Sequence, residues 1–442
     1  MGILKKIAIP GRETSRSIDF LLIMLITFLT WKTSYSFFVS DDWGYLSLFK
    51  DKGLEGIFEP YNNHIIPLHK LVYFAELKTF GVNSIFFQYC NIFTFSIAVF
   101  LFYKLLWLIL KNQFWTIAGT LLFLLHPVNS YYILWGFQIC QTLHILFQLA
   151  FFYYFIKYTV DKKSLTLVIA ISAIIMQNFF FGNGIFFPLL LIAGGWLYKN
   201  LPHKKIIVVV GISLQIIFIL LQTLYGNNDV AIAVGDIPAI LEAMLQYAGR
   251  NILRYFSLLE INFGKTLALI VASLFVAFLL YIYIKKKDKR KTILIVTGWL
   301  AVTLIAIPVA RRAIISASVM PVYYYGLSLI PFCILIVIAL SNIKSSIIIK
   351  NKVLVFFSTL IFLVLFFIDQ RITGSYATRD LRNRLAMTKA IQNHTEYSPF
   401  DDPIFNGADS AIKKQNLKPV ETFGYWQKNT KAFFLSEELI NK

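Results

Sequence analysis

The chain has 442 residues, of which 57% are hydrophobic and 15% are charged, and its mean hydropathy is +0.66. A soluble globular domain is roughly half apolar and about a quarter charged, so this composition excludes an ordinary soluble enzyme and indicates a polytopic membrane protein. The net charge of +19 does not indicate nucleic-acid binding, because the Lys and Arg residues lie in short loops between apolar runs, where they act as topology signals.

Apolar runs alternate with polar loops along the whole chain. The first run, 18–39, follows an arm with four basic residues and one acidic residue, which the positive-inside rule places in the cytoplasm. Each later short loop on the same side is also basic, most strongly at 285–291. The pattern predicts about eleven membrane-spanning helices, with the N-terminus inside and the C-terminus outside. Among the expected spans are 84–110, 114–125, 206–225 and 353–368.

The predicted fold class is an all-α polytopic membrane domain over residues 1–369. Two long outer loops, 40–83 and 226–264, interrupt it, and a polar outer segment, 370–442, follows it. The first loop contains apolar stretches too short to cross a bilayer, so we expect interfacial helices there. In the second loop, 237–256 is expected to form an amphipathic helix on the membrane surface.

Two adjacent carboxylates, Asp41 and Asp42, directly follow the first apolar run. Carboxylates at the mouth of a hydrophobic bundle are costly to hold in place. The functional interpretation is that one of them acts as general base on an acceptor hydroxyl or orients it. The alternative is a solvated loop start, where Asp caps the next helix. The sequence leaves open which aspartate is the base.

The same loop carries Tyr61, Asn63 and His64. His64 can hydrogen-bond a sugar or a phosphate, or carry a proton, whereas the alternative is an ordinary polar interfacial loop. Oxygen ligands suit hard divalent ions, but no ligand spacing here demands a metal. We therefore expect no metal and no cofactor.

Two arginine pairs lie in loops assigned to the outer side. Arg311 and Arg312 oppose the positive-inside tendency in a short loop ahead of Tyr323. A phosphate is a natural partner for guanidinium groups at this depth. Arg250 and Arg254 share one helix face at i, i+4 spacing. They are candidates for binding a lipid phosphate, and simple headgroup contact is the alternative.

An aromatic and polar segment between the third and fourth runs contains Trp135 and Gln138. Trp side chains stack well on sugar faces, but they also populate ordinary interfacial belts. Gln138 adds hydrogen-bonding capacity. We interpret the segment as part of a substrate-binding mouth.

Together these motifs resemble the GT-C class of polyprenyl-phosphate-sugar-dependent glycosyltransferases. The points of resemblance are Asp41-Asp42 after the first span, Asn63-His64 with Pro67 in the first loop, the segment 135–138, and arginines before a tyrosine-rich span. Within that class, the size and the polar outer tail are similar to phage- or prophage-encoded O-antigen glucosyltransferases that convert bacterial serotype.

The resemblance implies an inverting hexosyltransferase of the bacterial inner membrane. A flipped undecaprenyl-phosphate sugar, expected to be glucose, would bind with its phosphate near Arg311 and Arg312. Asp41 or Asp42 would deprotonate or orient a hydroxyl of lipopolysaccharide or another surface glycan. The expected partners are this donor, the glycan acceptor and the lipid bilayer, with a flippase and a donor-synthesising protein as further possible partners.

Three other classes of function compete with this interpretation. A transporter or flippase of a lipid-linked saccharide would need ionisable residues deep within its spans and some internal symmetry, and no internal repeat is evident. A membrane acyltransferase or phosphoethanolamine-type transferase would need a nucleophile or a His-rich cluster, and the histidines here are scattered. A scaffolding protein fits the outer aspartate and arginine pairs least well.

Overall fold

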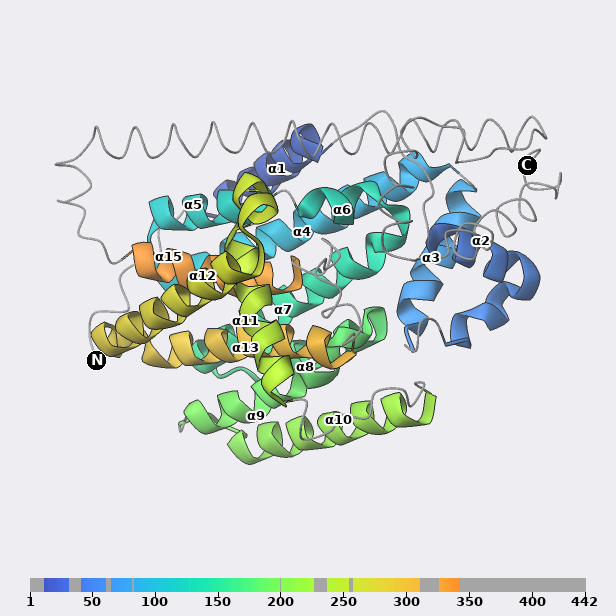
Figure 1. Cartoon of the computed structure of the whole chain (residues 1–442). Coiled ribbons are helices and arrows are strands. Elements are labelled where there is room, and N and C mark those ends of the chain that lie inside the picture. Colours follow the sequence, from blue (N-terminus) through green and yellow to red (C-terminus); the bar gives the residue numbers. More distant parts are fainter. Residues whose placement is uncertain are drawn as a thin grey trace.

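The computed structural model describes residues 12–31, 41–60, 65–81, 83–126, 128–198, 200–225, 237–253, 257–310 and 326–341. Every secondary-structure element in these ranges is helical, which confirms the predicted all-α class for this part of the chain. Figure 1 shows the helices in one bundle. In chain order the elements are α1 (Arg12–Trp31), α2 (Asp41–Lys52), η1 (Gly53–Phe58), α3 (Pro67–Phe80), α4 (Ser84–Leu110), α5 (Gln113–Leu124), α6 (Asn129–Leu134), η2 (Gly136–Gln138), α7 (Ile139–Asp161), α8 (Ser164–Phe180), η3 (Gly182–Phe186), α9 (Pro188–Leu197), α10 (Lys204–Tyr225), α11 (Ile237–Leu253), α12 (Ser257–Lys285), η6 (Lys287–Lys289), α13 (Arg290–Ala310) and α15 (Gly326–Leu340).

Among the described residues, four helical segments are long and apolar enough to cross a membrane. They are Ser84–Leu110, Gly136–Asp161, Lys204–Leu221 and Thr266–Lys285. Five shorter apolar helices accompany them, including Asp19–Thr30 of α1. The membrane character of the chain is therefore shown, whereas the number of about eleven spans stays a prediction. The last expected span, 353–368, lies outside the described residues.

The centre of the bundle is the layer formed by α4, α7 and α8. Helix α7 packs between α4 and α8, and α1 packs on α4. Aromatic side chains tie this layer to the helices that follow: the rings of Phe152 in α7 and Trp299 in α13 stack with centroids 3.6 Å apart. Phe275 of α12 stacks on Phe332 of α15 at 4.2 Å.

Helices α10 and α12 turn large apolar side chains outward. Ile206, Val209, Ile216 and Leu220 of α10 are each about half exposed. Continuous exposure of aliphatic side chains along a whole helix would be unfavourable in water, and it is the expected surface of a helix that faces lipid.

Two predicted cytoplasmic loops are turns of only two residues. Lys111 follows α4 with φ 55°, and Asn112 then caps α5 by accepting a hydrogen bond from the backbone N–H of Trp115 at 3.1 Å. Lys162 follows α7 with φ 55° before α8 begins. A left-handed residue at the helix end lets the chain reverse at once, so α4–α5 and α7–α8 form tight helical hairpins with basic tips.

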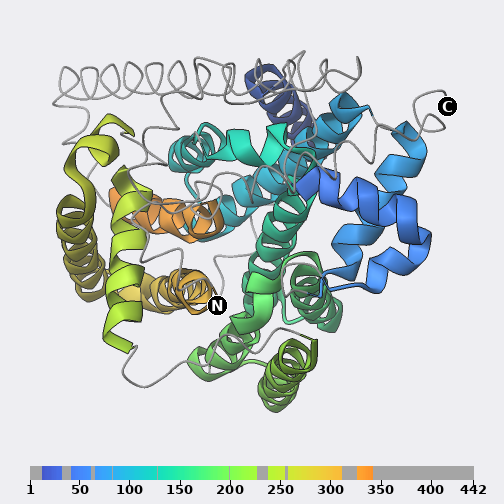
Figure 2. The ribbon, with the colours of Figure 1, turned by 45° about the vertical axis from the view of Figure 1, so that its right-hand side comes forward.

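The helices expected in the first long loop are present as α2, η1 and α3, and their interfacial position stays a prediction. Figures 1 and 2 show this unit at one end of the bundle, beside the ends of α4 and α8. Helix α3 packs mainly on α8, and it also contacts α4 and α7. Tyr45, Phe49 and Tyr73 of the unit pack with Phe87 of α4 in a small hydrophobic core.

Candidate functional site

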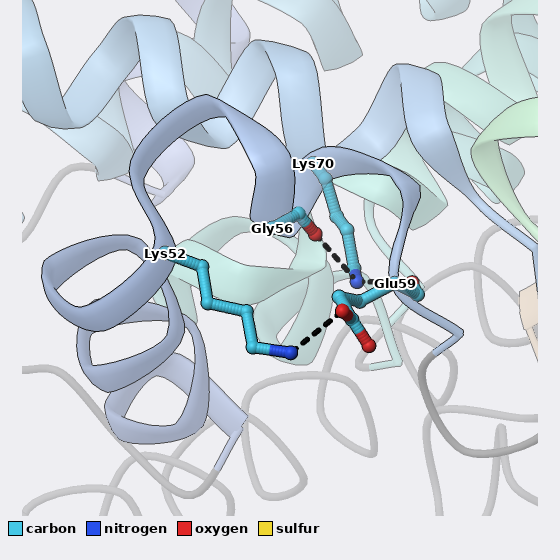
Figure 3. Close-up of polar contacts among 4 residues, drawn as sticks. All are labelled: Lys52, Gly56, Glu59 and Lys70. Atoms are coloured by element: carbon cyan, nitrogen blue, oxygen red, sulfur yellow. Dashed lines mark hydrogen bonds and ion pairs between the residues drawn. The ribbon is translucent and has the colours of Figure 1, made fainter.

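The buried side chain of Lys70 in α3 stabilises the α2–η1–α3 unit through hydrogen bonds. Its Nζ donates a hydrogen bond to the carbonyl oxygen of Gly56 at 3.0 Å and another to that of Glu59, as Figure 3 shows. The side chain is fully buried. Burial lowers the pKa of Lys70 to about 8, and the carboxylate of Glu59 partly opposes that shift. The buried ammonium therefore fixes η1 and the loop after it against α3.

A second basic side chain, Lys52, contacts the same loop at the protein surface. Lys52 forms an ion pair with Glu59 at 2.6 Å, and both side chains are largely exposed. The hydrogen bond from Lys52 lowers the pKa of Glu59. An ion pair between side chains that are about half exposed contributes little to stability.

Asp42 is the best-defined of the predicted site residues. Its side chain has no exposed surface. Its Oδ1 accepts a hydrogen bond from the hydroxyl of Tyr73 at 2.9 Å. A Cβ atom at Gly136 would lie only 3.2 Å from the same oxygen, so the backbone of η2 packs directly against the carboxyl group. The interpretation of Asp42 as a solvated loop residue is therefore wrong.

Buried polar residues on one face of α3 lie close to Asp42 or to its neighbours. His69, Tyr73 and Glu76 follow each other at intervals of four and three residues, so they share a side of the helix. All three are buried. Burial raises the pKa of Glu76 to about 8; a hydrogen bond with Cys90 opposes this shift, and the nearby Asp42 makes a smaller contribution in the same direction as burial. Glu76 is therefore largely protonated at neutral pH.

His69 and Tyr73 are neutral for the same physical reason. Burial lowers the pKa of His69 to about 3. Burial and the charge of Asp42 raise the pKa of Tyr73 well above its usual value. Tyr45 of α2 completes the cluster, because its hydroxyl lies 3.1 Å from Nδ1 of His69. The His69 ring also meets the ring of Phe137 edge-on, with centroids 4.7 Å apart.

The structure thus brings two of the predicted stretches together: the start of α2 and the segment 135–138. Gly136, Phe137 and Gln138 are buried against the unit, whereas Trp135 is half-buried beside Phe137. The amide of Asn91 in α4 donates a hydrogen bond to the carbonyl oxygen of Trp135 at 2.9 Å, which fixes the segment to the bundle. Asp41 is the first residue of α2.

Other predicted site residues are separate from this cluster or outside the described part. Arg250 lies in the last turn of α11, and Figure 2 shows α11 on the opposite side of the bundle from α2 and α3. The structure therefore does not bring Arg250 and Asp42 together. The predicted residues outside the described ranges are Tyr61, Asn63, His64, Arg254, Arg311, Arg312 and Tyr323.

The sequence interpretation missed the α3 face and a second polar group inside the bundle. The α3 residues could have been found in the sequence, because their spacing of four and three residues places them on one helix face. His144 in α7 is fully buried, with Nδ1 3.2 Å from the carbonyl oxygen of Gln177 and Nε2 2.7 Å from Nε2 of Gln148. The sequence feature that indicates this polar group is the presence of Gln141 and Gln148 on the same helix face as His144 within an apolar run.

Neither the α2–α3 cluster nor the group around His144 is a preformed metal-binding site. In the part of the chain that the structure describes, no group of three or more His, Cys, Asp or Glu side chains is arranged to hold a metal ion. What the α2–α3 cluster offers is a buried carboxyl group with its hydrogen-bond donor and a ring of neutral polar side chains.

Comparison with known proteins gives only distant likenesses among solved structures. No model of a protein family and no curated protein sequence matches the chain. A crystal structure of ArnT from Cupriavidus metallidurans, bound to undecaprenyl phosphate, is similar with a TM-score of 0.47 and 14% sequence identity. The match covers 76% of this chain and 61% of that chain, so this chain spans less than two thirds of the length of ArnT. A TM-score of this size does not establish a shared fold.

Proposed function

We propose that this protein is a membrane glycosyltransferase of the GT-C type. It transfers a sugar, which we take to be glucose, from a polyprenyl-phosphate carrier to a surface glycan such as the O-antigen of lipopolysaccharide. The reaction takes place at the outer face of the bacterial inner membrane. The acceptor hydroxyl attacks the anomeric carbon with inversion, the bond from that carbon to the phosphate oxygen breaks, and polyprenyl phosphate leaves.

One observation carries the proposal. Asp42 in the first loop and Gly136 in the segment 135–138 are far apart in the sequence, yet the carboxyl oxygen of Asp42 lies against the backbone at Gly136. These are two of the stretches on which the family resemblance rests. Their meeting at one end of an apolar bundle is the arrangement that an enzyme acting at a membrane surface needs.

The two aspartates have different roles in this proposal. A general base must reach the hydroxyl that it deprotonates, and the carboxyl group of Asp42 is fully buried with Tyr73 as its donor. We therefore assign the base to Asp41 and treat Asp42 as a positioning residue. Asp42 holds the start of α2 against α3 and η2, and so fixes the direction in which Asp41 enters the site.

The remaining predicted residues take substrate-binding roles in the proposal. Trp135 and Gln138 belong to the sugar site, together with Tyr61, Asn63 and His64 of the first loop. Arg311 and Arg312 bind the phosphate of the donor, and Tyr323 belongs to the same substrate site. Arg250 and Arg254 interact with lipid phosphate.

The test is sugar transfer by membranes that contain matched amounts of each variant. Membranes are given polyprenyl-phosphate [14C]glucose, and label is counted in lipopolysaccharide. Asp41→Asn is expected to abolish transfer with an unchanged Tm, whereas Asp42→Asn is expected to lower both transfer and Tm. Asp51→Asn is the control, because Asp51 is an exposed residue of the same helix. Normal transfer by Asp41→Asn would show that the assignment of the base is wrong.

A flippase for a lipid-linked saccharide is the second candidate function, and His144 favours it. This histidine is an ionisable residue buried inside a predicted span, which is a feature that transporters use. In the transfer assay, a flippase would leave label on the polyprenyl carrier in every variant.

A further inference from the structure

The helix pair α7–α8 contains a group of glutamines around His144 that the candidate site does not use. Gln141, His144 and Gln148 lie three and four residues apart, so they share one face of α7. The backbone carbonyl oxygen of Gln177 in α8 lies 3.2 Å from Nδ1 of His144. All four side chains are buried, with at most 1% exposed. Polar groups at this position inside an apolar helix pair are costly unless each polar atom has a partner.

Only part of the hydrogen-bonding capacity of this group is used within the protein. Both ring nitrogens of His144 have partners, and a neutral ring satisfies them by donating from Nδ1 to the Gln177 carbonyl and accepting at Nε2 from the Gln148 amide. In contrast, Oε1 of Gln141, Oε1 of Gln148 and both side-chain amide atoms of Gln177 have no hydrogen-bond partner among the described residues. Three acceptors and one donor group are left unused.

We propose that these glutamines form a binding site for hydroxyl groups. A hydroxyl donates one hydrogen bond and accepts others, so it complements carbonyl oxygens that stand beside an amide N–H. A charged ligand fits less well, because none of the four side chains carries a formal charge when His144 is neutral. The hydroxyl comes either from an ordered water molecule or from the sugar that the protein handles.

The position of the group connects it with the candidate site. Gln138 lies one turn before Gln141, is buried, and also has an Oε1 without a partner among the described residues. The polar face therefore starts beside Gly136 and continues into the bundle. A sugar hydroxyl as the ligand of this site rests on the proposed function, whereas a water molecule as the ligand does not.

The experiment compares the wild type with Gln177→Leu, which keeps the size of the side chain and removes the amide. Gln215→Leu in α10 is the control, because Oε1 of Gln215 is also without a partner among the described residues but belongs to another helix. Hydroxyl-radical labelling with mass spectrometry detects internal water beside His144, which has no exposed surface. Thermal unfolding in detergent is then measured with polyprenyl-phosphate glucose and with polyprenyl phosphate alone.

If water occupies the site, His144 is labelled in the wild type and in Gln215→Leu, and labelling falls several-fold in Gln177→Leu together with its Tm. If the sugar occupies it, the sugar-bearing carrier raises the wild-type Tm more than the carrier alone does, and Gln177→Leu loses that difference. Absence of labelling, with a Tm for Gln177→Leu at or above that of the wild type and unchanged ligand shifts, would overturn the proposal. Gln141→Leu replaces Gln177→Leu if the latter does not fold.

Failure of the proposed function has a separate signature. In that case the sugar-bearing carrier and the bare carrier shift the wild-type Tm equally, while labelling of His144 persists and still depends on Gln177. This result would support the hydroxyl site with water as its ligand and would remove only the sugar as source.

Discussion

The hydrogen bond from Tyr73 to Asp42 gives the sharpest prediction about the α2–α3 cluster. Tyr73→Phe removes only the hydroxyl that donates to Oδ1 at 2.9 Å, and both side chains are fully buried. Removing the donor from a buried acceptor costs about 1–3 kcal/mol, with the upper end applying to an ionised acceptor. We expect the free energy of unfolding to fall by this amount in an SDS titration in mixed micelles.

A double-mutant cycle separates this contact from other effects of the substitution. In the Asp42→Asn background, Tyr73→Phe should cost clearly less than in the wild type, because the two side chains are coupled. Tyr281→Phe is the matched control, since the Tyr281 side chain is 59% exposed on α12 and should change stability by less than about 0.5 kcal/mol. Equal costs of Tyr73→Phe in both backgrounds would refute the reasoning.

Three further predictions follow from burial and close packing. The pKa of Glu76 is raised from 4.5 to about 8, so between these pH values the folded state holds a proton that the unfolded state loses, and the stability contributed by this group falls as the pH rises. The Tm of Glu76→Gln should therefore exceed that of the wild type by a margin that grows from pH 4.5 to 8. A margin that stays constant over this range would contradict the raised pKa. Lys70→Met should lower the free energy of unfolding by about 2–4 kcal/mol, because two carbonyl oxygens lose their shared donor, whereas Lys78→Met on the exposed side of α3 should have little effect. Gly249→Ala should lower Tm strongly, since a Cβ there would lie 1.8 Å from the carbonyl oxygen of Ala268, and Gly298→Ala, whose Cβ would have 3.4 Å to its nearest neighbour, should be tolerated.

Helix type and approximate limits could be predicted from the sequence wherever apolar runs were long. The expected span 84–110 coincides with α4, and 206–225 lies within α10. These segments are recognisable because a helix buried in lipid must satisfy its own backbone and be apolar throughout. The presence of helices in the first loop was also predicted, from apolar stretches too short to cross the membrane.

The surroundings of Asp42 could not be predicted in the same way. Its position after the first apolar run marked it as a candidate, but its burial depends on Tyr73 and on Gly136. Contacts between segments so distant in the chain leave no local pattern in one sequence. The same holds for Arg250, because nothing in its i, i+4 spacing with Arg254 shows that α11 lies across the bundle from α2 and α3.

For His144, in contrast, the sequence itself contained a local pattern, but no function was inferred from it. Two glutamines on its helix face interrupt an apolar run, and this pattern is evidence of a polar interior. Only the structure shows that the backbone carbonyl of Gln177 in α8 lies within hydrogen-bond distance of His144 and that the Gln177 side chain is buried.

The central claim is that the chain moves a sugar from a lipid carrier to a glycan, and reconstitution tests it most directly. Purified protein in proteoliposomes is given polyprenyl-phosphate [14C]glucose in the outer leaflet and lipopolysaccharide in the medium. Our account predicts label in lipopolysaccharide with wild type and with Asp51→Asn, and none with Asp41→Asn. Label that instead stays on the carrier and becomes protected inside the vesicles would contradict the account and establish a flippase.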